Sequence, residues 1–319
     1  GQHYDDRLSD VFFADLAIPQ PAVHLGIGSG SHGVQTGAML SALDGVLDAQ
    51  RPDWVLVYGD TNSTLAGALA AAKLRVPVAH VEAGLRSFNR AMPEELNRVV
   101  ADHLSSVLLC PSPAAVENLK AEGVTAGVHL VGDVMYDAVL RFAARAEERS
   151  TVLRDLGLGP NGYLLATVHR AENTDDTARL REILSAFSRI GEPVVFPVHP
   201  RTRKIIGGLD LPLGPNVRAV GAVGYLDMLA LERHARMILT DSGGVQKEAY
   251  WLGVPCVTLR DETEWVETVE AGWNTLAGAD RARILEAVKS FRPAAGPRPR
   301  LYGDGRVAER CVRVLESRA

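Results

Sequence analysis

The chain has 319 residues, of which 46% are hydrophobic and 23% are charged, and its formal net charge at pH 7 is −5. This length is enough for two domains, and the composition is ordinary for a globular protein. An acidic chain is a poor candidate for a general nucleic-acid-binding protein, which needs a basic surface. No apolar stretch is long enough to span a bilayer and no secretory signal pattern opens the chain, so we expect no membrane partner.

The three cysteines are dispersed and odd in number, at positions 110, 256 and 311. This arrangement argues against a zinc site and against a disulfide framework. Cys110 and Cys256 lie in apolar surroundings, where we expect small core residues. The cysteine usage therefore favours a reducing, cytoplasmic setting.

Short apolar runs alternate with helical patterns along the whole chain. We predict strands at 54–58, 77–81, 107–110, 128–131, 163–168, 194–198, 217–220, 237–239 and 256–259. We predict helices at 65–74, 114–122, 138–156, 176–190, 226–234, 245–252 and 305–317. Such alternation indicates parallel sheets with right-handed crossovers.

The pattern restarts after the charged helical stretch at 138–156, so we expect two doubly wound α/β domains that face each other across a cleft. We place the first domain at 1–150 and the second at 151–303, with the join near 149–159. The last segment, 304–319, is expected to dock back on the first domain.

The predicted strand at 54–58 is apolar enough to be buried, and it runs directly into the polar turn Gly59-Asp60-Thr61-Asn62-Ser63-Thr64. Strand, polar turn and helix is the order of a ligand-binding βα unit. Asp60 and Thr61 either cap the following helix or contact a ligand, and the position of Asp60 at the strand tip favours the second interpretation for that residue.

A second acidic segment follows the apolar run at 76–79 and reads His80-Val81-Glu82-Ala83-Gly84-Leu85-Arg86, with Pro93-Glu94-Glu95-Leu96-Asn97-Arg98 shortly after it. Carboxylates at strand ends can transfer protons, and arginines there can hold phosphate. Glu82 or Glu94 alone would indicate a surface salt bridge. Their occurrence together with Arg86 and Arg98 favours a site.

A glycine turn in the second half reads Thr240-Asp241-Ser242-Gly243-Gly244-Val245-Gln246-Lys247-Glu248. The two glycines allow a close approach of the backbone to a ligand, and a helix N-terminus offers free N–H donors, as in a diphosphate site. Two interpretations of Glu248 stay open: an acid in the first helical turn that favours the helix dipole, or an acceptor for ribose hydroxyls.

Two histidines follow successive predicted strands, each close to an arginine: His169 beside Arg170, and His199 before Arg201. A single histidine is usually structural, but this pair favours an anion pocket. The charged run at 260–267 is either a segment that closes the cleft or a solvated connector with internal ion pairs.

Taken together, these segments resemble the non-hydrolysing UDP-N-acetylglucosamine 2-epimerase family along essentially the whole chain. The matching runs are 59–61, 80–86, 93–98, 169–173 and 240–248. Within the family, the runs 58–69, 85–90 and 260–267 resemble the branch that acts on UDP-2,3-diacetamido-2,3-dideoxy-glucuronate.

The resemblance implies a GT-B fold and inversion at sugar C2 through elimination and re-addition of UDP, without NAD, metal or another cofactor. It also implies a UDP-sugar substrate, a homodimer and a place in polysaccharide biosynthesis. It assigns the acid/base roles to Asp60, Glu82 and Glu94 and a catalytic-site role to His169. It assigns substrate-binding positions to Arg86, Arg98, Arg170, His199, Ser242, Gly243, Gly244 and Glu248.

Three departures from the family pattern affect these expectations. The family has a first strand, a helix and a second strand before the stretch that begins here at Gly1, so either the sequence is truncated or part of the site is lacking. Asp5 and Ala38 align where substrate-activated members carry a polar residue and an arginine, so we expect weak or absent substrate activation. Ala171 stands where many members have a second arginine.

A uronate substrate would need an arginine partner for its carboxylate, and the candidates are Arg90, Arg201 and Arg260. The rival functions are a GT-B glycosyltransferase, a hydrolysing 2-epimerase and a non-enzymatic nucleotide-sugar binder, because a fold does not determine a function.

Overall fold

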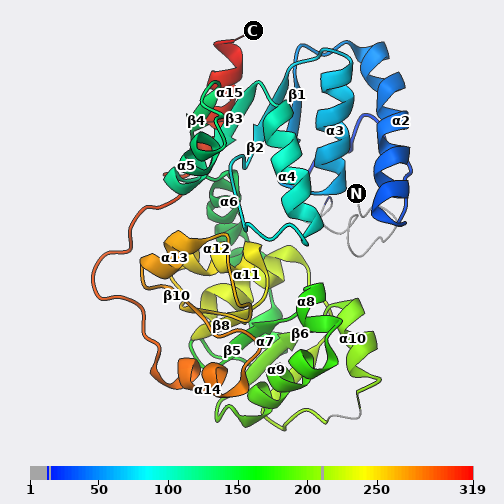
Figure 1. Cartoon of the computed structure of the whole chain (residues 1–319). Helices are drawn as coiled ribbons and strands as arrows, with labels where there is room; N and C mark the ends of the chain where they lie inside the picture. The colour runs from blue at the N-terminus through cyan, green and yellow to red at the C-terminus, as the bar shows by residue number, and fades with distance from the viewer. Residues whose placement is uncertain (1–12, 14–15, 210–211, 319) are drawn as a thin grey trace. The chain divides into compact units, whose positions relative to one another are not determined.

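The computed structural model describes residues 13, 16–209 and 212–318. The chain folds into two compact units, of which unit 1 comprises 1–138 and 300–319 and unit 2 comprises 139–299. Each is a parallel α/β unit, as predicted (Figure 1). No helix of the described residues combines the length and the apolar character of a membrane span. The expectation for Asp5 concerns a residue outside the described part.

Unit 1 contains a four-stranded parallel sheet whose strands follow one another in chain order, β1-β2-β3-β4. Its strands are β1 (Val55–Tyr58), β2 (Val78–Val81), β3 (Val107–Cys110) and β4 (Val128–Leu130). Its helices are α2 (His32–Gln50), α3 (Asn62–Lys73), α4 (Pro93–Leu104), α5 (Pro113–Ala121) and α15 (Val307–Glu316), and the boundary between the units falls within α6 (Val134–Arg149).

Successive residues of the β2 strand point to opposite faces of this sheet, so two apolar clusters form. Val78 packs with Val57 and the alanines of α3 on one face, where α2, α3 and α4 lie side by side (Figure 1). Ala79 packs on the other face with Val307 and Cys311 of α15. The C-terminal helix therefore belongs to the core of unit 1.

The prediction of a buried strand at 54–58 was wrong in one respect. Leu56 is 37% exposed and Tyr58 is 59% exposed, because β1 pairs only with β2 among the described residues. A cavity of about 460 Å³ runs along this strand, lined by apolar side chains such as Met39 and Leu43 of α2. Asp60, Glu82 and Glu94 do not line it.

Unit 2 contains a six-stranded parallel sheet with the order β10-β9-β8-β5-β6-β7. Its strands are β5 (Leu164–Thr167), β6 (Val194–Pro197), β7 (Val217–Val220), β8 (Met237–Thr240), β9 (Cys256–Thr258) and β10 (Asn274–Leu276). Its helices are α7 (Val152–Asp155), α8 (Ala171–Thr174), α9 (Thr177–Arg189), α10 (Pro200–Ile206), α11 (Tyr225–His234), α12 (Gly243–Leu252), α13 (Val266–Glu270) and α14 (Arg281–Ser290).

The order of the strands reverses between β5 and β8, so this sheet is doubly wound. Ligands of such sheets bind beyond the carboxyl ends of the strands at the point of reversal. The side chains of β5 and β8 are buried, which explains their continuous apolar sequence. The core under them includes Phe187 and Phe196, whose rings meet edge to face at 5.7 Å.

The expected helix over 138–156 is two helices, α6 and α7, which are separated at Ser150 and Thr151. The Ser150 hydroxyl donates to Asp227 at 2.6 Å and accepts the Val152 N–H at 3.3 Å. Such side-chain bonds compete with helix continuation, which explains the break.

Candidate active site

Asp60 follows β1 at a turn that the fold holds in place. Gly59 has φ +61°, a left-handed conformation that glycine adopts without strain. The Asp60 carboxylate accepts a hydrogen bond from Arg98 at 2.5 Å, and its carbonyl accepts one from Asn97 at 2.9 Å. Thr61 occupies the N-cap position of α3 without a side-chain capping bond, so neither residue caps the helix through its side chain.

Arg98 also donates to Glu95 at 2.8 Å, and both side chains are buried. Glu95 in turn accepts the N–H groups of Ser87 and Phe88, at 3.0 and 2.9 Å. Glu95 was not predicted as a site residue, and its signal in the sequence was only its place beside Glu94. The geometry makes it the link between the loop at residue 87 and the Asp60 turn.

Glu82 follows β2 and has φ +71°, a conformation that costs a non-glycine residue on the order of 1–3 kcal/mol. Its carboxylate lies beside the Asp60 turn, because a methyl group placed on Gly59 would be 3.5 Å from Glu82 Oε2. Glu94, in the first turn of α4, is half-buried and has no hydrogen bond or ion pair to any described residue. Strain and an unengaged carboxylate are features of functional sites.

A buried polar network lies under this turn. The His80 ring faces Asp102 Oδ1 at Nδ1 and the Gly59 carbonyl at Nε2, both at 2.7 Å. Asp102 Oδ2 accepts from the Gly84 N–H at 3.1 Å and from Arg86 at 2.7 Å. Both partners of His80 are acceptors, so the ring needs two N–H donors, which only the imidazolium has.

Arg86 is fully engaged in this network. Its guanidinium donates to Glu122 at 2.6 and 2.7 Å and to the Leu85 carbonyl at 2.6 Å, in addition to Asp102. These carboxylates keep the pKa of Arg86 above its ordinary value, although burial opposes them. Arg86 is thus placed to support the turn, and its predicted contact with the substrate stays a prediction.

In unit 2 the predicted residues meet at the point where the strand order reverses. Asp241, after β8, is completely buried and accepts the N–H groups of His169 at 3.0 Å and Arg170 at 3.1 Å. It also accepts from Asn173 at 3.1 Å. Asp241 was not predicted as a site residue, yet it positions both His169 and Arg170 after β5.

Arg170 points to the start of α12, where Ser242 accepts the Val245 N–H as a helix cap. A methyl group on Gly243 would lie 3.8 Å from an Arg170 Nη atom and 3.1 Å from the Trp265 indole nitrogen. Within the described part of the chain, Arg170 Nε is buried and has no hydrogen-bond acceptor. A helix N-terminus and an arginine with an unused buried donor form the elements of an anion site.

His169 lies close to the Asp241 carboxylate, with Nε2 and Oδ1 3.9 Å apart. Burial lowers the pKa of His169, Asp241 opposes this effect, and Arg170 and His199 add to it. The His169 and His199 rings are 6.0 Å apart, and His199 Nδ1 accepts the Arg201 N–H at 3.3 Å. The structure thus brings the two predicted histidines together, with His169 favoured as neutral imidazole.

Glu248 lies on α12, which begins at Gly243, so it falls in the second helical turn. The interpretation as a first-turn acid was therefore wrong. Glu248 is 7% exposed, and its carboxylate accepts a hydrogen bond from the Tyr225 hydroxyl at 3.0 Å.

The run at 260–267 is not a solvated connector, as one interpretation of the sequence had it. Arg260 and Glu264 are buried and form an ion pair of 2.8 Å. Trp265 is buried as well, and the Lys247 ammonium lies 3.8 Å from its ring centroid. The run packs against the start of α12 and so contributes to the candidate anion site.

Comparisons with known proteins show which family the chain belongs to. The family model described as UDP-N-acetylglucosamine 2-epimerase matches residues 1–316. The chain belongs to the UDP-N-acetylglucosamine 2-epimerase family.

Relatives cover nearly the whole chain. The UDP-2,3-diacetamido-2,3-dideoxy-D-glucuronate 2-epimerase of Pseudomonas aeruginosa is 50% identical over 99% of this chain and 89% of the relative. A UDP-N-acetylglucosamine 2-epimerase homolog of Methanococcus maripaludis is 51% identical over 99% of this chain and 90% of its own. The solved structure of the Methanocaldococcus jannaschii UDP-GlcNAc 2-epimerase in complex with UDP-GlcNAc and UDP has a TM-score of 0.93 at 43% identity, covering 99% of this chain and 90% of that one.

The expected GT-B fold and the family are thereby confirmed. The individual roles of the site residues remain predictions.

Proposed function

We propose that this protein inverts C2 of a UDP-N-acetylhexosamine by eliminating and re-adding UDP. In the first step the C2 proton leaves, the bond between C1 and the UDP oxygen breaks, and a C1–C2 double bond forms. In the second step UDP adds back to C1 while C2 receives a proton on the opposite face. Such a reaction needs a base, an acid and a firm hold on the diphosphate.

The observation that carries the proposal is the anion site of unit 2. Arg170, whose buried Nε donor has no acceptor among the described residues, lies beside the N-terminus of α12, so a diphosphate would gain both a cation and backbone donors. Ser242, Gly243 and Gly244 line that terminus, and Glu248 would accept from the ribose hydroxyls. His199 lies beside His169 and completes the proposed binding residues of this unit.

The acid/base chemistry is assigned to the carboxylates of unit 1 together with His169. Glu94 is supported by its lack of any partner in the described residues, and Glu82 by its strained backbone beside the Asp60 turn. Arg98 donates a hydrogen bond to Asp60, and we propose that its main role is to orient the Asp60 carboxylate. His169 is supported by its lowered pKa, because a neutral imidazole can accept a proton near pH 7.

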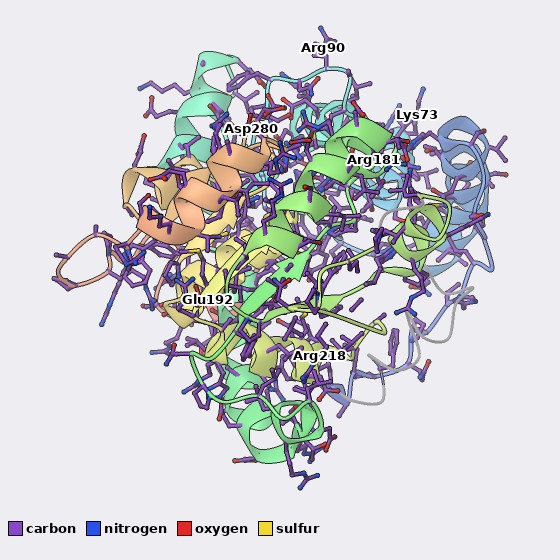
Figure 2. All side chains as sticks on the ribbon, turned by 90° about the horizontal axis from the view of Figure 1, so that it is seen from below. Lys73, Arg90, Arg181, Glu192, Arg218 and Asp280 are labelled. Carbon is purple, nitrogen blue, oxygen red and sulfur yellow. The ribbon has the colours of Figure 1, made fainter. Side chains whose placement is uncertain are left out.

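The proposed substrate is UDP-GlcNAc or its 2,3-diacetamido-uronate analogue, with a preference for the uronate. Among the candidate partners of its carboxylate, Arg260 is already neutralised by Glu264 inside the protein. Arg201 forms an exposed pair with Asp175, and Arg90 lies exposed on the surface (Figure 2). Arg201→Met or Arg90→Met should lower kcat/KM for the uronate and leave that for UDP-GlcNAc unchanged.

The proposal also includes a cytoplasmic homodimer.

The proposed epimerase reaction is tested by incubating the enzyme with UDP-GlcNAc alone, and separately with its C2 epimer or with the uronate pair. The products are then separated by chromatography. An epimerase reaches the same mixture from either epimer. Free UDP with free sugar would indicate a hydrolysing epimerase, and no reaction until an acceptor is added would indicate a glycosyltransferase.

A further inference from the structure

A second acid lies behind Glu248 and has no role in the proposed reaction. Glu232, on α11, is completely buried. Neither of its carboxyl oxygens has a hydrogen-bond donor among the described residues when both acids are taken as ionised. The carboxyl group of Glu248 lies within hydrogen-bonding reach of Glu232. A buried carboxylate without a donor would be strongly destabilising, so its protonation state must differ from that of an exposed glutamate.

Two carboxyl groups form a hydrogen bond only if one of them carries a proton. Glu248 has another donor, the Tyr225 hydroxyl at 3.0 Å, and it is slightly exposed, whereas Glu232 has neither advantage. The proton therefore belongs on Glu232. Burial, followed by the charge of Glu248, raises the pKa of Glu232 well above its ordinary value.

The groups of the described residues that act on Glu232 carry no compensating positive charge. Tyr225 and Tyr163 have pKa values raised by burial, so both phenols are neutral. Burial raises the pKa of the Cys256 thiol to about 12. On α7, which packs against α11, the charged Arg154 and Asp155 are exposed and pair with each other at 3.4 Å.

At the end of α11, the charges of Arg233 and His234 are directed to Glu147 of α6, at 3.3 and 2.8 Å. They form an outer ion-pair cluster in which Glu232 takes no part.

We propose that Glu232 is a neutral positioning residue that donates its O–H to the Glu248 carboxylate and so orients that carboxylate for the ribose of the nucleotide. The role toward the ribose rests on the proposed function, whereas the protonation of Glu232 does not. A carboxylate has about four lone-pair sites, so one that accepts from two donors can still accept from ribose hydroxyls. The second acid thus fixes the direction of Glu248 without adding a second negative charge.

The test compares Glu232→Gln with Glu232→Met. The glutamine has the same shape and donates through its amide, whereas the methionine fills the space but donates nothing. The readout is the ratio of the dissociation constants for 2′-deoxy-UDP and UDP, measured by titration calorimetry. We expect the wild type and Glu232→Gln to prefer UDP by about tenfold, as a hydrogen bond to a charged group allows, and Glu232→Met to lose most of this preference.

Infrared spectroscopy tests the proton without any nucleotide. The wild type should show the C=O band of a protonated buried carboxyl group at neutral pH, and Glu232→Gln should lack it. Absence of the band in the wild type would overturn the proposal, as would an unchanged ratio in Glu232→Met or a lost ratio in Glu232→Gln. If the wild type bound neither nucleotide while the band was present, the proposed function would fail and the protonated Glu232 would stand.

Discussion

Asp60 and Glu95 accept hydrogen bonds from the same guanidinium, that of Arg98, at 2.5 and 2.8 Å. One arginine therefore connects a candidate catalytic carboxylate to the carboxylate that holds the loop at residue 87. Arg98 is buried, so water does not compete for these two hydrogen bonds.

Arg98→Lys should lower kcat by on the order of 100-fold, because a lysine cannot hold two carboxylates in one plane and a displaced catalytic group loses about this much. Arg181→Lys is the matched control, since Arg181 is exposed on α9 (Figure 2) and should behave as the wild type. Steady-state kinetics with UDP-GlcNAc measures both variants. A kcat of Arg98→Lys within twofold of the control would contradict the positioning role.

The lowered pKa of His169 predicts a pH dependence. Burial favours the neutral ring, so protonation in the folded protein occurs below the ordinary value of 6.5. The acid limb of kcat/KM that belongs to His169 should therefore be centred below pH 6.5 and should be absent from the residual activity of His169→Gln. The contribution of His169 to stability has the same sign: it is complete above pH 6.5 and is lost as the pH falls through the lowered pKa. A limb centred above 6.5 would show that the charged ring is the stable form.

The two contacts of His80 predict that its ring donates from both nitrogens, to Asp102 and to the Gly59 carbonyl. Nitrogen-15 NMR of the histidine side chains at pH 7 should show hydrogen bonds donated from both ring nitrogens of His80. A neutral tautomer at pH 7 would contradict this assignment.

His80→Gln should also destabilise the fold by about 3–5 kcal/mol, the usual effect of removing one partner of a buried ion pair. His103→Gln is the control, because its pair with Glu122 is partly exposed and should contribute at most about 1 kcal/mol. Urea denaturation measures both variants. Equal losses of unfolding free energy in the two variants would contradict a larger stabilising effect of the buried network.

Gly243→Ala should weaken UDP binding by about tenfold, because its methyl group would lie 3.1 Å from the Trp265 indole nitrogen and crowd the start of α12. Gly191→Ala serves as the control, since nothing lies within 4 Å of its added methyl group. Calorimetry of UDP binding distinguishes them. Unchanged affinity in Gly243→Ala would remove this helix terminus from the binding site.

The sequence predicted β1 to β9 because buried parallel strands are continuous apolar runs, as in β3 and β8, but it missed the short edge strand β10. It did not predict α2, in which Gly33, Gly37 and Gly45 weaken the helical pattern. Nor could it reveal that Leu56 and Tyr58 are exposed, because exposure at a sheet edge depends on which strands pair.

The candidate site was predictable where chemistry lies in short runs, such as the one around Glu82. Residues that act across the fold were missed. Asp102 lies 22 positions from His80, and Glu232 lies 16 positions from Glu248, so only the tertiary structure shows that they interact.

The most direct test of the central claim is proton NMR of the reaction in deuterium oxide, with UDP-GlcNAc and with its 2,3-diacetamido-uronate analogue. The proposed elimination predicts that deuterium enters C2 while the epimeric UDP-sugar appears and no acceptor is present. Tight binding of UDP without deuterium at C2 of either sugar would contradict the proposed reaction.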